Sequence, residues 1–156
     1  MKNEMHNQVL ITVTKAKTGE VHSTVCRNLR TDIGVNWQAM HSIGDVANEP
    51  ARNIALSSRA TAPASGDTDL KGEQAADGLS RKTGTYSHTA DQSLATLSEA
   101  WQYTGGSTVT IKKAAIATAA TDLDTSADTH FLITAVSPVA VLDSNDTIAI
   151  DWGVNF

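Results

Sequence analysis

The last ten residues, TIAIDWGVNF, alternate between large apolar side chains and small or polar ones. The apolar members are Ile148, Ile150, Trp152, Val154 and Phe156. A two-residue period places alternate side chains on opposite faces of a β-strand. Terminal residues are usually poorly ordered unless a sheet holds them. The pattern therefore predicts a final strand whose apolar face, from Ile148 to Phe156, lies in the core.

The same period recurs along most of the chain. Residues 8–30 predict a hairpin, because Val9, Ile11 and Val13 alternate with outward positions and Thr18-Gly19 supplies a turn. Further strands are predicted over residues 53–57, 79–89, 93–104, 107–119 and 130–142, the last broken at Pro138. A polar turn at residues 143–146 leads into the final strand. Eight or nine short strands separated by turn signals are typical of a sandwich, jelly roll or barrel.

Residues 31–50 change to a helical period. Thr31 or Asp32 can cap the start, and Pro50 ends the segment. One helical stripe holds Val35, Ala39, Ile43 and Val46. The predicted fold class is therefore mainly β, an antiparallel β-sandwich or jelly roll, with one short helix near the N-terminal third.

A long connection follows the strand at residues 53–57. Its central part, from Ala60 to Gln74, is rich in Ala, Ser, Thr, Pro and Gly. Long segments without secondary structure are uncommon in compact domains unless they are functional. We therefore predict that this loop packs on the surface or against a partner. The polar arm at residues 1–7 is the second predicted contact surface.

The chain has 156 residues, which suits one β-sandwich domain over residues 1–156 with a short arm at residues 1–7. A single cysteine, Cys26, excludes an intrachain disulfide and suits assembly in a reducing compartment. The net charge of −5 argues against a nucleic-acid partner. No segment approaches the ~20 apolar residues of a membrane-spanning helix, and the N-terminus lacks a secretory signal. We therefore expect no membrane partner.

No constellation of catalytic quality is present in the sequence. No serine has a G-x-S-x-G context, and no two histidines share a metal-binding motif. We interpret the histidines as surface or hydrogen-bonded structural residues, namely His6, His22, His41, His88 and His130. Cys26 is interpreted as a half-buried small hydrophobe. The sequence thus predicts no enzyme, with no catalytic, cofactor-binding or metal-binding residues.

Two patterns leave alternatives open. In TDLDTSADTH, oxygen-bearing side chains recur at every second residue from Asp122 to Asp128, as in calcium loops. The glycine and glutamate of such loops are replaced by Ala127 and Ile133, which favours a polar loop over an ion site. Aromatic side chains could also form a sugar-binding platform, or they could pack in the core or an interface. These are Tyr86, Trp101 and Tyr103.

Several motifs, read in order, resemble a group of small virion proteins of tailed bacteriophages. They are an I-A-L strand, an A-T-A-P-A-x-x-D-T-x-L loop, a G-L-x-R strand, a V-x-I-K-K-A strand and a closing D-x-I-x-I-x-W strand. Here they occupy Ile54–Leu56, Ala60–Leu70, Gly78–Arg81, Val109–Ala114 and Asp146–Trp152. The resemblance covers roughly residues 53–156, and its motifs are structural rather than catalytic.

The resemblance implies a β-sandwich or jelly-roll component of a virion, assembled in the host cytoplasm. Proteins of this kind decorate or cement capsids, often as homotrimers, and others occupy the neck, tail or baseplate. The expected function is therefore a non-enzymatic capsid decoration protein, with the major capsid protein and further copies of itself as partners. The alternatives are a tail, neck or baseplate component, a carbohydrate-binding module and, least favoured, a hydrolase.

Overall fold

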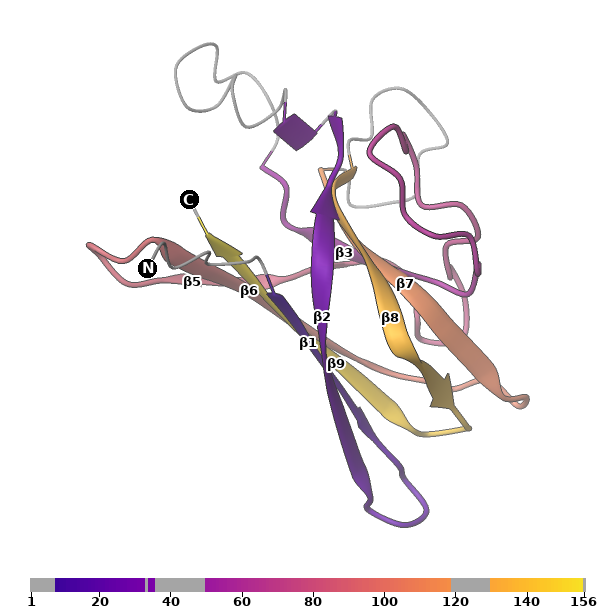
Figure 1. Ribbon diagram of the computed structural model, residues 1–156. Coiled ribbons are helices and arrows are strands. Elements are labelled where there is room, and N and C mark those ends of the chain that lie inside the picture. Colours follow the sequence, from indigo (N-terminus) through magenta and orange to yellow (C-terminus); the bar gives the residue numbers. More distant parts are fainter. Residues whose placement is uncertain (1–7, 33, 36–49, 119–129, 156) are drawn as a thin grey trace.

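The computed structural model describes residues 8–32, 34–35, 50–118 and 130–155 (Figure 1). The described residues form nine strands, and every pairing between them is antiparallel. The strands are β1 (Gln8–Thr14), β2 (Val21–Arg30), β3 (Asn53–Ser57), β4 (Lys82–Thr83), β5 (Thr85–His88), β6 (Leu94–Gln102), β7 (Val109–Ala117), β8 (His130–Leu142) and β9 (Thr147–Asn155). The predicted mainly β class is therefore confirmed.

The strands form one curled sheet in the order β4-β3-β7-β8-β2-β1-β9-β6-β5. Its two end strands, β4 and β5, are consecutive in the chain and are separated by Gly84 alone. A Cβ at Gly84 would lie 2.8 Å from Leu97 Cγ and 3.3 Å from Ile54 Cδ1, so a side chain there would enter the core. Strands that bend from one part of a sheet to another form the corners of barrel-like folds. The sheet consequently comes close to closing on itself.

The core lies inside this curled sheet. On β9, Ile148, Ile150 and Trp152 are fully buried, and Val154 is 7% exposed. The alternation predicted for the end of the chain is therefore confirmed up to Val154, whereas Phe156 lies outside the described residues. β9 is central because it pairs with β1 on one side and β6 on the other.

The predicted turns form at residues that tolerate a left-handed backbone. Gly19 has a φ of 69° in the β1–β2 turn, and Asn145 has a φ of 71° between β8 and β9. At the start of the segment predicted as a helix over residues 31–50, the Thr31 hydroxyl accepts a hydrogen bond of 2.9 Å from the Gly34 amide. Residues 32, 34 and 35 are helical, and the remainder of that prediction lies outside the described residues.

The strand predicted to break at Pro138 continues through it, so that prediction was wrong in part. β8 runs unbroken from His130 to Leu142, but its ladder with β7 shifts register. Ile111 lies opposite Ala140 and Lys113 opposite Ala135, so residues 136–139 face Lys112 alone. This irregularity bends the strand, as β-bulges do.

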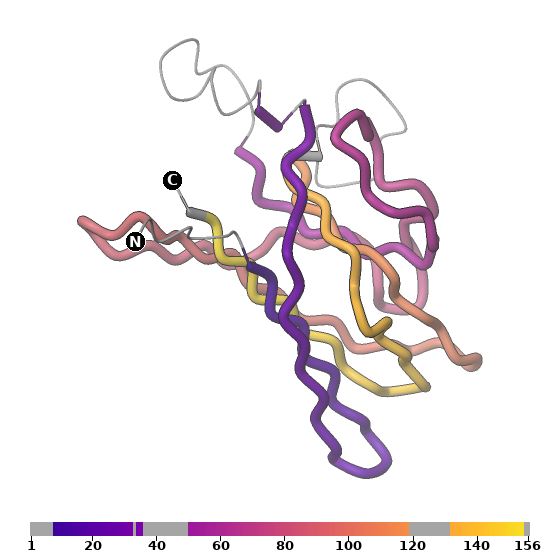
Figure 2. Tube along the Cα trace, viewed as in Figure 1, coloured from indigo at the N-terminus to yellow at the C-terminus, as the bar shows by residue number. Residues whose placement is uncertain are grey.

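The strand predicted over residues 79–89 is also different in the structure. It begins at Lys82 and divides at Gly84, since β4 pairs with β3 while β5 pairs with β6. Local periodicity cannot distinguish one strand from two that belong to different parts of a sheet. The tube in Figure 2 follows the chain through this corner.

Candidate interaction surface

The long connection between β3 and β4 packs against the outer face of the sheet. Leu70, which is 4% exposed, forms a second buried cluster with Ala55, Ala115 and Ile133. Ile54 and Leu56 point the other way, into the main core. The two alanines leave room on the outer face for the leucine of the connection. The prediction that this loop packs on the surface is confirmed.

Backbone hydrogen bonds extend β3 and hold the returning part of the connection. The Gln74 amide donates to Leu56 O at 2.8 Å, and Ser58 donates to Gly72 O at 3.3 Å. The Ser57 hydroxyl, itself buried, donates to Lys71 O at 2.7 Å. Residues 71–74 are therefore fixed to the end of β3.

A buried ion pair fixes the same part of the connection to the start of β4. Arg81 Nε lies 2.8 Å from Glu73 Oε1, and Arg81 Nη2 lies 2.6 Å from Glu73 Oε2. The two side chains are only 2% and 3% exposed. Two parallel hydrogen bonds define a bidentate pair, whose planar geometry sets the orientation of both groups.

The outer part of the connection presents small and mostly uncharged side chains. Its exposed residues are Ala60, Thr61, Ala62, Ala64, Ser65, Gly66 and Thr68. Asp67 folds back, because its Oδ2 accepts a hydrogen bond of 2.9 Å from the Ala64 amide. The Asp32 amide donates to Ser65 O at 2.8 Å, which joins the loop to the segment after β2. This loop, residues 60–68, is a firmly held surface of small residues.

Lys113 lies on β7 and is only 4% exposed. Burial lowers the pKa of its ammonium group, while the charges of Asp67 and Asp69 in the connection act in the opposite direction. Asp69 Oδ1 is buried and has no hydrogen-bond partner among the described residues. The carboxylates of the connection therefore offset only part of the cost of burying this cation, to which the charge of Arg59 adds.

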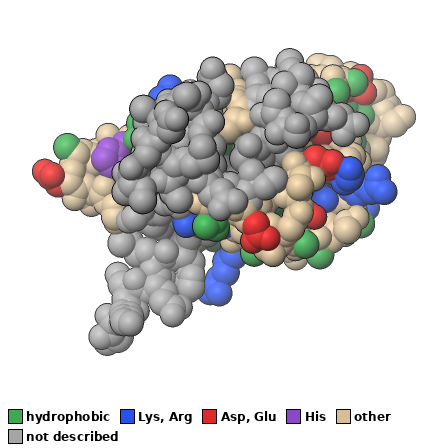
Figure 3. Space-filling view, turned by 90° about the horizontal axis from the view of Figure 1, so that it is seen from above, with side chains coloured by type: hydrophobic (Ala, Val, Ile, Leu, Met, Phe, Trp, Pro, Cys, Tyr) green, Lys and Arg blue, Asp and Glu red, His purple; other side chains and the backbone are tan. Residues whose placement is uncertain are grey.

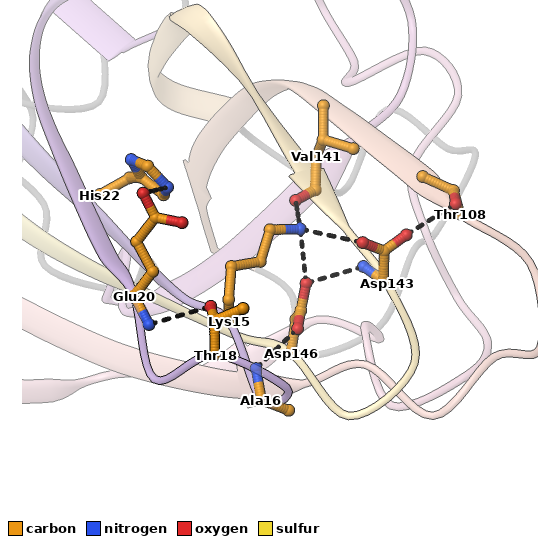
Figure 4. A network of polar contacts seen from close by, with 9 residues as sticks. All are labelled: Lys15, Ala16, Thr18, Glu20, His22, Thr108, Val141, Asp143 and Asp146. Atoms are coloured by element: carbon orange, nitrogen blue, oxygen red, sulfur yellow. Dashed lines mark hydrogen bonds and ion pairs between the residues drawn. The ribbon is translucent and has the colours of Figure 1, made fainter.

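A polar network joins the β1–β2 turn to the β8–β9 turn (Figure 4). Lys15 Nζ donates to Asp146 Oδ2 at 2.7 Å, to Asp143 Oδ2 at 3.1 Å and to Val141 O at 3.0 Å. The Ala16 amide donates to Asp146 Oδ1 at 2.8 Å. Asp146 is 2% exposed, so these bonds satisfy a buried carboxylate.

The network shifts the pKa of its members. Burial raises the pKa of Asp146, but hydrogen bonds from Lys15 and from the Asp143 and Ala16 amides outweigh this effect, so the pKa lies below 3.8. The Asp146 hydrogen bond is the main cause that raises the pKa of Lys15 above 10.5. Stability from Asp146 is therefore fully present above the ordinary carboxyl pKa and is lost as the pH falls through its folded pKa.

We expect Lys15→Met to lower the free energy of unfolding by about 1.5–3 kcal/mol at neutral pH, because it removes a charged hydrogen bond to a buried carboxylate. The loss should shrink as the pH falls through the folded pKa of Asp146, because protonation removes the charge that Lys15 binds. Urea unfolding at pH 7 and pH 2 measures both values. Lys17→Met, in the same turn, is the control and should have little effect. An equal loss for Lys15→Met at both pH values would contradict this role of the ion pair.

The aromatic side chains are divided between core and surface. Trp101 is 1% exposed and its Nε1 donates to Ser80 O at 2.8 Å; Tyr103 is 5% exposed and its hydroxyl donates to Ser107 O. Tyr86 is 52% exposed, and the Arg52 guanidinium lies 5.6 Å from its ring centroid. The core interpretation is confirmed for Trp101 and Tyr103, so a platform of all three aromatics is wrong.

The described histidines make local contacts. His22 Nε2 lies 3.2 Å from Glu20 Oε1, and His88 Nε2 lies 2.8 Å from Gln92 O. His6 and His41 lie outside the described residues, as does the side chain of His130. Cys26 is 6% exposed and its Sγ lies 3.9 Å from Ser137 O, so it is more buried than the predicted half-buried hydrophobe.

Within the described part of the chain, no group of three or more His, Cys, Asp or Glu side chains is placed to hold a metal ion. The aspartate pattern from Asp122 to Asp128 lies outside that part. None of the helical segments that the structure describes has the length and apolar character needed to cross a bilayer. On the face seen from above, the described acidic and basic side chains are mixed rather than separated by sign (Figure 3).

Sequence reasoning missed both ion-pair networks. Glu73 and Arg81 are eight residues apart, whereas Lys15 and Asp146 are far apart in the chain. A charged residue beside a predicted turn, such as Asp146 before β9, is only a weak indication of a buried ion pair, because turns are usually polar. Only the pairing of β1 with β9 brings Lys15 to that turn.

A comparison of the chain with family models, curated proteins and solved structures finds no match.

Proposed function

We propose that this chain is a non-enzymatic structural protein of a tailed-phage virion. Its most favoured role is that of a capsid decoration protein, which binds the assembled head and stabilises it. The nearly closed sheet would serve as a β-sandwich or jelly-roll type of scaffold. The observation that supports this role best is the loop at residues 60–68, which is exposed yet firmly held. The motif resemblance of residues 53–156 supports a phage capsid as the partner.

A firmly held loop is suited to docking because little conformational entropy is lost when it binds. Leu70 and the Glu73–Arg81 pair hold the loop against the sheet before any partner arrives. Small side chains allow the backbone of a partner to approach closely. A ligand that binds only the assembled capsid stabilises that state by mass action, and several copies in one oligomer raise avidity by about 10²–10⁴-fold.

The test is a binding assay with emptied, expanded phage heads and, separately, with isolated tails. After sedimentation, the copies bound to each particle are counted. Hundreds of copies per head would support decoration. A ring of a few to a dozen copies on tails or at the head vertex would instead assign the protein to the neck, tail or baseplate. Binding to neither particle would contradict the proposal.

We expect a charge placed on the loop to weaken head binding without affecting the fold. Ala62→Glu puts a carboxylate on the exposed surface, and an unpaired charge in a contact raises the dissociation constant by about tenfold or more. Copies bound per head report the effect, and thermal unfolding reports the fold. Lys17→Glu, on the β1–β2 turn, is the matched control. Unchanged binding of Ala62→Glu would remove this loop from the contact.

The arm at residues 1–7 is the second proposed contact. An extended segment can add a strand to a sheet edge of a neighbouring subunit, where main-chain hydrogen bonds provide affinity. Deleting residues 1–7 should then reduce the copies bound per head and leave the melting temperature unchanged. Unchanged binding would remove the arm from the mechanism.

A further inference from the structure

Exposed large hydrophobic side chains gather on three neighbouring strands. The sheet order places β1, β2 and β8 side by side. Among the described residues, six of the nine exposed large hydrophobics lie on these strands: Leu10, Val21, Val25, Leu29, Val139 and Val141. Apolar side chains gathered on the surface of a soluble protein mark interaction sites. The outer face of these strands is therefore a candidate contact surface.

Leu10 and Val25 lie at the centre of this surface. The register of β1 and β2 places them directly opposite each other, and they are 38% and 59% exposed. Their chain neighbours Val9 and Cys26 are buried in the core, so Leu10 and Val25 project outward. Directly opposite residues of adjacent strands are close enough for their side chains to touch. They form one apolar contact point.

Two charges of opposite sign flank this point. Arg27 follows Val25 on the same face of β2, and Asp151 of β9 lies directly opposite Leu10. Both charged side chains are exposed. Other described residues on this face of β1, β2 and β9 are uncharged: Gln8, Thr12, Thr14, Val21, Ser23, Leu29, Thr147, Ala149 and Gly153. The face thus has an apolar centre between one cation and one anion.

We infer that this face binds a second copy of the chain about a two-fold axis. A two-fold axis that lies parallel to the face and crosses β1 obliquely between Gln8 and Leu10 exchanges the positions of Arg27 and Asp151. Each Arg27 then meets Asp151 of the other copy, and the apolar centre of one face covers that of the other. A two-fold contact requires such a self-complementary patch.

The charge pattern favours a second copy over an unrelated partner. The net charge of −5 makes two copies repel each other, so a stable contact needs attraction that depends on orientation. The Arg27–Asp151 pairs give two such attractions in a two-fold dimer. An orientation that brings Arg27 to Arg27 or Asp151 to Asp151 is disfavoured, because like charges then face each other. This inference goes beyond capsid binding and concerns the isolated protein.

The test is sedimentation velocity of the purified full chain over a range of concentrations. We expect a concentration-dependent dimer. Arg27→Glu and Asp151→Arg should each raise the dimer dissociation constant by about tenfold or more, because each creates two like-charge contacts. The double variant restores opposite charges and should return the constant to within about threefold of the original value. Lys17→Glu is the control for the change in net charge.

Both substituted side chains are exposed, so thermal unfolding of each variant should match that of the original protein. Arg27→Gln and Asp151→Asn each remove a charge instead of reversing it. Both of these milder variants should also weaken the dimer. A protein that stays monomeric at all concentrations would overturn the inference. An oligomer of any size, a trimer included, that is indifferent to both reversals would also overturn it. Head binding plays no part in this experiment, so the two proposals fail independently.

Discussion

Trp152→Ala should lower the free energy of unfolding by about 3–5 kcal/mol, which is typical of removing a buried aromatic side chain. Trp152 is fully buried on β9, where it lies opposite Val9 of β1 and Leu97 of β6. The substitution would leave a cavity between three strands that cannot collapse easily, because two of them are held on their far sides by β2 and β5.

Urea unfolding at neutral pH, followed by fluorescence of the remaining tryptophans, Trp37 and Trp101, and by circular dichroism, measures this loss. Thr147→Ala is the control on the outward face of the same strand, where the cost should stay below about 1 kcal/mol. A Trp152→Ala protein that lost less than about 1.5 kcal/mol would show that the end of β9 contributes little to the core.

Glu73→Ala should also cost about 3–5 kcal/mol, because it leaves the Arg81 guanidinium buried without its carboxylate. Both side chains are at most 3% exposed, so water cannot readily replace the lost partner. The connection should also loosen, since the Glu73 carboxylate holds it to Arg81 at the start of β4. Limited proteolysis should then cut within residues 60–68 before the rest of the chain.

The double variant Glu73→Met with Arg81→Met tests the cause. Replacing both charges by apolar side chains removes the buried cation together with its carboxylate, so most of the lost stability should return. The matched control is the partly exposed pair of Lys82 and Glu99, whose charged atoms lie 3.9 Å apart. Glu99→Ala should cost no more than about 1 kcal/mol. A double variant as unstable as Glu73→Ala would assign the loss to packing rather than to charge.

The two predictions concern different parts of the support of the proposed contact loop. Trp152 stabilises the core inside the curled sheet on which the connection packs. The Glu73–Arg81 pair holds the connection itself on the outside of that sheet. If the loop must be firmly held to bind, Glu73→Ala should weaken head binding more than its loss of global stability explains. The double variant should recover binding together with stability.

The strands and their turns could be predicted because their signals are local. The alternation in β1 and β9 places Val9 and Trp152 in the core, and Gly19 and Asn145 accept the left-handed backbone of the turns. The predicted bounds of β3 are confirmed, and its apolar residues 54–56 are buried on both faces of the sheet. The length and composition of the connection predicted that it packs on the surface, as Leu70 does against the outer face of the sheet.

Local sequence signals could not predict how the sheet closes or where the connection attaches to it. They depend on which strands meet, and this is decided by the burial of all apolar faces at once. Gly84 resembles any glycine in a strand until Leu97 and Ile54 are seen to occupy the space beside it. The opposed pair of Leu10 and Asp151 exists only because β1 lies beside β9.

The sequence by itself therefore determined the mainly β class, most strand positions and the inward faces, because a two-residue period and turn residues act over a few neighbours. The tertiary structure alone decided how β4 and β5 divide at Gly84 and which charges meet across the sheet. Pairing Lys15 with Asp146 and Arg81 with Glu73 requires side chains from separate segments to be buried together, and their burial makes those contacts matter for stability.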